Sequence, residues 1–152
     1  MTGRKTAVHW LASAAPDPEA CRRAWERDPL GVALLPAGRA WDVLILPGGL
    51  GHRTLDVLTR VLDRPGPVLA DFGDRRVGFF VPPGTAAHWL GTGIRAAGPG
   101  TWIVVPHPGR AARSVRWLVA PDGAGTLTDP MLLELAMHEA AAGPTRPGGA
   151  GG

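Results

Sequence analysis

The stretch WDVLILPGGLGHRTLD, residues 41–56, places glycines between an apolar strand and a predicted helix, which is the order that proteins use to hold phosphates. A dinucleotide fingerprint needs G-x-G-x-x-G, and a Walker A loop needs a lysine and a Ser or Thr after its last glycine. Here the order is G-G-L-G, and His52 and Arg53 follow it. Two interpretations stay open: an anion site at the helix N-terminus, helped by His52 and Arg53, and a plain strand-to-helix turn, which the spacing favours.

Other residue types that do chemistry occur singly. His138 begins an H-E-x-x-H zinc motif, but Ala142 stands where the second histidine is needed. Ser13 and Ser114 lie outside any G-x-S-x-G motif, and Cys21 falls on the inward face of a predicted helix. We therefore expect no metal site, no cofactor and no catalytic residue.

The composition limits the class of protein. With 152 residues, 45% of them hydrophobic, the chain is long enough for one domain with its own core. The formal charge is only +3 and acidic residues are interleaved with the arginines, so charge gives little support for DNA binding. No apolar run approaches the roughly 18–20 residues that cross a bilayer, so no membrane association is expected. A single cysteine suits the cytoplasm, and the Arg, Ala, Gly and Pro bias is typical of a GC-rich genome such as that of an actinobacterium.

The pattern of apolar segments along the sequence predicts an α+β fold, with a mixed or antiparallel sheet of about six strands flanked by helices. Two pairs of neighbouring strands are expected, the first joined by a hairpin-like turn: 31–36 with 41–47, and 101–109 with 114–123. The other predicted strands are 66–71 and 75–84, and the predicted helices are 4–15, 18–28, 52–63, 85–90 and one that begins at Asp129-Pro130.

The end of the chain divides into a helix and a tail. The last predicted helix is expected to turn Met131, Leu132, Leu135 and Ala136 inward. Residues 143–152, GPTRPGGAGG, have too little apolar surface to order themselves, so a disordered tail is expected. Residues 1–142 then form a single domain.

Five segments between about Gly31 and Pro121 follow one another in an order typical of a known family. They are GVALLPAG, WDVLILPGG, GDRRVGFFVPPG, GIRAAGPGTWIVVPHPG and SVRWLVAPDG. This order resembles the strands and turns of the N-terminal domain of bifunctional DNA primase/polymerases, of the archaeo-eukaryotic primase type. The resemblance covers roughly sixty percent of the chain and implies a primase/polymerase-like fold with an RRM-like core.

The active site of that family holds two divalent metal ions on carboxylates, and a histidine steers the nucleotide phosphates. Metal ions offset the charge that develops in phosphoryl transfer, so the acids are essential. Placed on the family pattern, this chain has Leu44 and Leu46 at the two acid positions and Arg76 or Val77 at the histidine position. The third acid falls near Gly93. The resemblance therefore implies a catalytically degenerate site in which every metal-binding acid is replaced.

With the metals gone, the resemblance implies a non-catalytic domain that binds a nucleotide, a nucleic acid or another anion in the former active-site cleft. Guanidinium groups can bind phosphates without a metal. The residues expected to bind the anion are Arg76, Arg95, Arg75, His52, Arg53 and His107. An open cleft in which Arg76 and Arg95 converge would favour anion binding, whereas a face sealed by Trp102 and Trp117 would favour an interface or plain core.

Two alternatives remain open. The tryptophan-bearing strands TWIVVP and VRWLVAP can leave an apolar face or edge for a like subunit, which gives a protein-interaction or homodimerisation module without a nucleotide function. The enzyme option is residual DNA primase/polymerase activity, or a new acidic site. That site would require Asp42, Asp71 and Asp74 to converge in the fold.

Overall fold

The computed structural model describes residues 2–28, 30–71, 73–89, 93–110, 112 and 114–142, with side chains from residue 6 onward. The helices are α1 (Thr2–Ala12), α2 (Pro18–Arg27), α3 (Gly48–Val61), α4 (Thr85–His88) and α5 (Pro130–Ala142). The strands are β1 (Val32–Pro36), β2 (Asp42–Pro47), β3 (Val68–Asp71), β4 (Arg76–Val81), β5 (Arg95–Ala97), β6 (Trp102–Pro106) and β7 (Arg116–Val119). None of the described helices is long and apolar enough to cross a membrane. The predicted tail, residues 143–152, lies outside the described residues.

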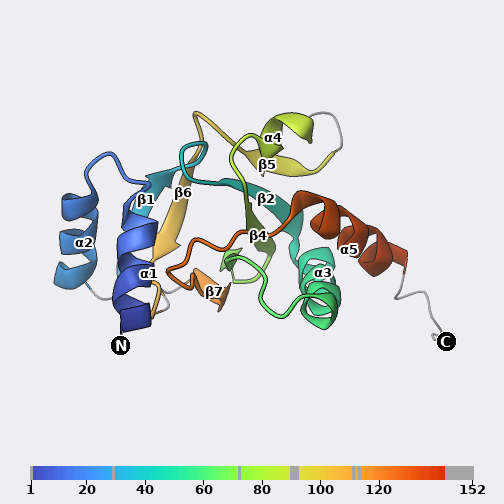
Figure 1. Cartoon of the computed structure of the whole chain (residues 1–152), viewed down its shortest axis with the longest axis horizontal. Helices are drawn as coiled ribbons and strands as arrows, with labels where there is room; N and C mark the ends of the chain where they lie inside the picture. Colours follow the sequence, from blue (N-terminus) through green and yellow to red (C-terminus); the bar gives the residue numbers. More distant parts are fainter. Residues whose placement is uncertain are drawn as a thin grey trace.

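The described strands form two antiparallel sheets, which confirms the predicted α+β class. The larger sheet has the order β5-β2-β4-β3-β7, and the smaller one pairs β1 with β6. Helices α3 and α5 lie on one side of the larger sheet, while the β1–β6 pair lies with α1 and α2 on the other side (Figure 1).

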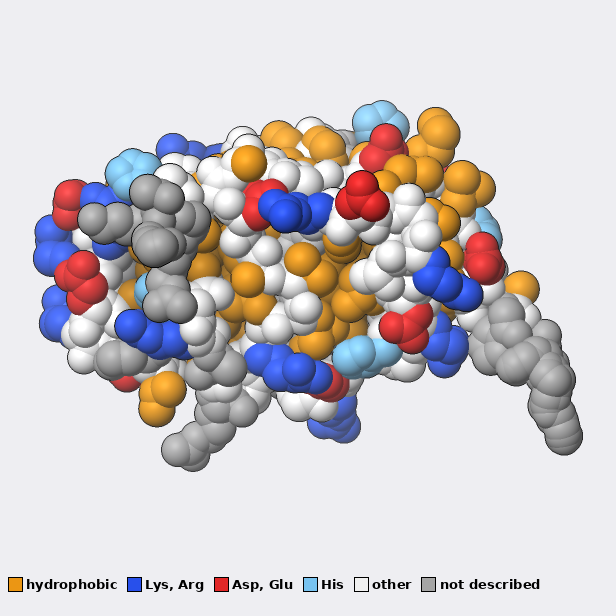
Figure 2. All heavy atoms as spheres, turned by 60° about the horizontal axis from the view of Figure 1, so that its bottom comes forward, with side chains coloured by type: hydrophobic (Ala, Val, Ile, Leu, Met, Phe, Trp, Pro, Cys, Tyr) orange, Lys and Arg blue, Asp and Glu red, His pale blue; other side chains and the backbone are white. Residues whose placement is uncertain are grey.

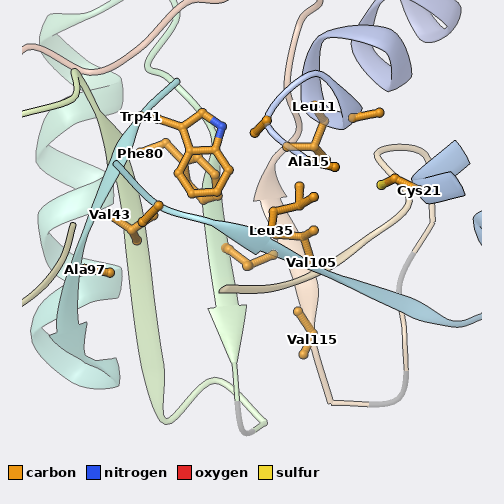
Figure 3. Packing of buried hydrophobic residues seen from close by; sticks show 14 of the residues in the cluster. Leu11, Ala15, Cys21, Leu35, Trp41, Val43, Phe80, Ala97, Val105 and Val115 are labelled. Carbon is orange, nitrogen blue, oxygen red and sulfur yellow. The ribbon is translucent and has the colours of Figure 1, made fainter. Parts of the chain in front are cut away.

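Two apolar cores hold these layers together. Side chains alternate along β2, so Leu44 and Leu46 enter the core beneath α3 and α5. Val43 points the other way, into a core that includes Leu35 of β1 and Val105 of β6. Figure 3 shows this second core, which joins the larger sheet to the β1–β6 pair and to α1. The larger sheet is therefore covered by helices on one face and by the small sheet on much of the other.

The strand pairings differ from those predicted. The β1 strand pairs with β6 and not with β2, because both edges of β2 are already occupied, by β4 and by β5. The β7 strand pairs with β3 and not with β6. The strand β5 was not predicted, because its three residues, RAA, include no apolar run that would mark a strand. The prediction paired strands that are neighbours in the sequence, whereas these pairings join strands that are distant in the chain.

Two helices also differ from the prediction. The buried face of α5 carries Leu133, Ala136 and Ala140, so the predicted inward face was right for Ala136 and wrong for Met131 and Leu135, which are exposed. The sequence MLLELAM is apolar almost all round a helix, and packing against α3 decides which face is buried. Helix α3 begins at Gly48 and not at His52, so the glycines form its first turn.

Candidate anion-binding cleft

The glycine-rich segment is a place where α3 and β4 approach closely. A Cβ at Gly48 would collide with the backbone oxygen of Asp74, and one at Gly51 would lie 2.5 Å from Cβ of Val77. The Gly48 amide also donates to the backbone oxygen of Arg75, at 2.8 Å. These contacts explain two of the glycines by packing, as the interpretation of a plain strand-to-helix turn expects.

The two side chains expected to help bind an anion at this helix N-terminus make contacts within the protein. His52 lies 3.4 Å from the carboxylate of Asp74, which also pairs with Arg116 at 2.6 Å. The hydrogen bond from Arg116 is the main reason that the pKa of Asp74 is lowered from its ordinary value. Arg53 donates from Nε to the backbone oxygen of Ala140, at 3.4 Å. Neither of these contacts directs the side chain toward a phosphate at the helix N-terminus.

The leucines at the family's acid positions lie in the core on the helix-covered face of the larger sheet. Leu44 is opposite Phe79 in β4 and Leu46 is opposite Val77, and all four side chains are buried. Arg76 is one residue away from Val77 and therefore points to the other face. The expectation that the arginines share a cleft with positions 44 and 46 was wrong, because the strand register separates them.

The three aspartates proposed as a new acidic site do not converge. Asp42 is opposite Val81 on β4, whereas Asp71 is opposite Arg76, and five residues of strand span about 16 Å. Asp42 is fully buried, and its Oδ2 accepts hydrogen bonds from the amides of Gly84 and Ala86 at the start of α4, at 2.9 and 2.8 Å. Within the described residues, no three His, Cys, Asp or Glu side chains are grouped in a way that could hold a metal ion.

The structure does bring Arg76 and Arg95 to one cleft. Ile45 of β2 lies between Gly78 of β4 and Arg95 of β5, and Arg76 is two residues before Gly78 on the same face. Both arginines line a cleft of about 430 Å³ between the larger sheet and β6. Asp71 lines the cleft too, directly across the β3–β4 pair from Arg76. The charged lining is therefore two arginines and one aspartate, a net charge of +1.

The walls of the cleft are mostly apolar. One wall consists of Val43, Ile45 and Leu69 from the larger sheet, and the other consists of Thr101 and the β6 residues 102–104. Trp102 is 51% exposed, so part of its indole ring is available to a ligand or a partner. Trp117 packs against Phe80, with ring centroids 5.7 Å apart, and is not part of the lining. The face that holds the arginines is thus not sealed by the two tryptophans.

The remaining predicted residues lie elsewhere. Arg75 is exposed in the turn before β4, outside the cleft lining. His107 follows the far end of β6, where its ring packs edge-on against Trp25 with centroids 5.8 Å apart. Its Nδ1 accepts a hydrogen bond from the Gly109 amide at 2.9 Å, so a neutral ring carries its proton on Nε2. Of the six predicted residues, only Arg76 and Arg95 share the cleft.

A second hollow, of about 700 Å³, lies between α4 and α5. Its walls include Trp89, Met131 and Met137, and His88, Glu134 and His138 add polar groups. Among the described residues, no arginine or lysine lines it, so it suits an anion less well than the cleft does. None of the predicted binding residues belongs to it.

The cleft also holds two residues that sequence reasoning did not assign to it. Asp71 was considered only as a metal ligand, although its place opposite Arg76 follows once β3 and β4 are taken as a hairpin. Trp102 was one of six tryptophans with no signal to separate exposed from buried rings. On the face that Figure 2 shows, basic and acidic side chains are interspersed around a hydrophobic area, and they form no basic stripe. This arrangement agrees with the weak case for an extended DNA-binding surface.

Comparisons with protein-family models, with curated proteins and with solved structures found no match for this chain. The resemblance to primase/polymerase domains therefore stays a prediction from the sequence.

Proposed function

We propose that the cleft between the larger sheet and β6 binds a base and its phosphate, supplied by a free nucleotide or by the end of a nucleic-acid strand, in a non-catalytic domain of a cytoplasmic protein. The observation that carries this proposal is that Arg76 and Arg95 both line one cleft. Guanidinium groups form strong, often bidentate hydrogen bonds with phosphate oxygens.

The shape and lining of the cleft suit such a ligand. Its volume of about 430 Å³ falls within the range of small-molecule sites, which are mostly apolar with a few polar groups. Ile45, Leu69 and Ile103 offer apolar surface to the flat faces of a base, and the exposed part of Trp102 offers a ring for stacking. Arg95, which is exposed, would meet the phosphate, and Asp71 would accept a hydrogen bond from an amino or hydroxyl group.

The same lining argues for binding without metal or turnover. Phosphoryl transfer needs clustered carboxylates for its metal ions, and Asp71 is the one acid among the described lining residues. The β2 residues that line the cleft, Val43 and Ile45, have no side-chain oxygen that could bind a metal ion. Because the net charge is only +1, we expect weak, salt-dependent binding, with Kd of about 0.1–1 mM.

Titrations followed by tryptophan fluorescence test the proposal. AMP, ATP and a short DNA primer-template are added separately, with and without manganese. Arg95→Ala should weaken binding about tenfold or more, since a hydrogen bond to a charged group contributes about 1.5–3 kcal/mol. Arg23→Ala, an exposed arginine on α2, is the control and should bind normally. The AMP and primer-template titrations separate a free nucleotide from a strand end. Tight binding that requires manganese would contradict the non-catalytic proposal.

A second candidate function is a homodimerisation or protein-interaction module without a nucleotide function. It is favoured by a separate observation: β1 and β6 leave large apolar side chains exposed, among them Val32, Leu34 and Trp102. Sedimentation measurements across a range of protein concentrations test this candidate, and a monomer throughout would contradict it.

A further inference from the structure

The β1–β6 pair, called the ribbon below, has two different faces. Its register places Leu35 opposite Ile103 and Leu34 opposite Val104. Side chains on opposite positions of paired strands share a face. Leu35, with no exposed surface, belongs to the face that packs into the core of Figure 3. The outer face carries Leu34 and its neighbours.

The exposed part of the ribbon's outer face is apolar, while Pro106, opposite Val32 on this face, is buried and Val104 is half-buried. Val32 is 43% exposed, Leu34 is 58% exposed and Trp102 is 51% exposed. The ten residues of the ribbon, VALLP and WIVVP, include no charged or hydrogen-bonding side chain except the indole of Trp102. Exposed strands normally carry charges that prevent association, and this ribbon carries none.

We propose that the outer face of the ribbon is the interface between two copies of this chain, packed ribbon against ribbon around a two-fold axis near Leu34. The proposal rests on the homodimerisation candidate and not on nucleotide binding. A second copy fits because an uncharged apolar face is complementary to itself, so a symmetric contact brings no like charges together. Sheets stack face to face at about 10 Å, with side chains from each filling the space between them.

The size of the face sets the strength of the contact. The exposed parts of Val32, Leu34 and Trp102 supply roughly 300 Å² of surface per copy, comparable to the large patches on monomeric proteins. A stable complex buries about 800 Å² per partner, so we expect a weak dimer with Kd of about 10 μM. Arg76 and Arg95 are not part of this face, whereas Trp102 belongs both to it and to the cleft lining.

Sedimentation equilibrium of the full chain, from about 1 to 200 μM, tests the proposal. Wild type should shift from monomer to dimer across this range. Leu34→Glu should raise Kd at least about a hundredfold, because the axis brings the two new carboxylates together. Leu135→Glu is the matched control: Leu135 is 61% exposed, close to Leu34, but lies on α5, so dimerisation should be unchanged.

Each outcome decides the proposal. Monomeric wild type at every concentration overturns it. A dimer that Leu135→Glu disrupts and Leu34→Glu preserves also overturns it, because the contact would then involve α5. Circular dichroism shows whether Leu34→Glu is folded, and Leu34→Ser is the milder variant if it is not. AMP titration of wild type and of the Leu34 variant reports on the cleft separately. Loss of dimerisation with normal AMP binding supports this interface, whereas a wild type that dimerises but does not bind AMP counts against the cleft alone.

Discussion

Alanine substitutions at two glycines in the first turn of α3 should change stability in opposite directions. A Cβ at Gly51 would lie 2.5 Å from Cβ and 2.8 Å from Cγ2 of Val77. Val77 is buried on central strand β4, so neither element can move away easily, and overpacking costs about 1–3 kcal/mol. Better helix propensity returns about 1 kcal/mol, which leaves Gly51→Ala destabilised by up to about 2 kcal/mol. Gly49 is exposed, and the nearest atom to its Cβ would be Nη1 of Arg53 at 3.5 Å, so Gly49→Ala should gain about 0.5 kcal/mol.

Urea unfolding followed by circular dichroism measures both free energies of unfolding under the same conditions. AMP titration of the same two variants adds an independent readout. A phosphate cradle at this turn would require close approach of the exposed Gly49 backbone to the ligand, so Gly49→Ala would weaken AMP binding. The close-packing explanation expects normal AMP binding by Gly49→Ala. Equal effects of Gly49→Ala and Gly51→Ala on the free energy of unfolding would refute the close-packing explanation.

Two further predictions concern buried and paired aspartates. Asp42→Ala leaves the amides of Gly84 and Ala86 without their acceptor and should destabilise the protein by about 2–4 kcal/mol, whereas Asp42→Asn keeps an acceptor oxygen and should cost less. Thermal melts of both variants check this. An Asp42→Ala variant as stable as wild type would show that these two hydrogen bonds do not stabilise the fold. The pKa of Asp74 is lowered, chiefly by the hydrogen bond from Arg116, so its contribution to stability is complete above the ordinary aspartate pKa of about 3.9 and is lost as pH falls through the lowered value. Wild type should therefore be slightly more stable than Asp74→Asn near neutral pH, and urea unfolding at successively lower pH should show this difference disappear; a difference that grows in acid would contradict the assignment.

Much of the fold follows from local patterns in the sequence. Short apolar runs mark most of the strands. The sequence Asp17-Pro18 is a typical helix start, and Asp17 accepts a hydrogen bond from the Ala20 amide at 3.1 Å at the beginning of α2. Long-range pairing does not follow, because the partner of β1 depends on which edges of β2 are free. The buried face of α5 was equally undetermined, since its apolar residues surround the helix.

The candidate site was predictable to a smaller extent. Arg76 and Arg95 share a cleft because both neighbours of β2, β4 and β5, present an arginine on the same face, which the predicted strand order did not include. His107 and Arg53 lie elsewhere because their positions depend on packing against α2 and α5. A one-residue change of register decides whether a side chain of β2 faces the helices or the cleft, and turn motifs alone do not determine that register.

Mapping AMP onto the protein by ¹⁵N NMR tests the central claim most directly, because it locates the ligand without relying on any substitution. The proposed function predicts that shifts on addition of AMP, without metal, concentrate at the amides of Gly78 and Arg95 and at the indole Nε1 of Trp102. Shifts concentrated at Gly48 and Gly49, or along α5 near Met131, would contradict the claim by placing the ligand at the helix N-terminus or in the hollow between α4 and α5.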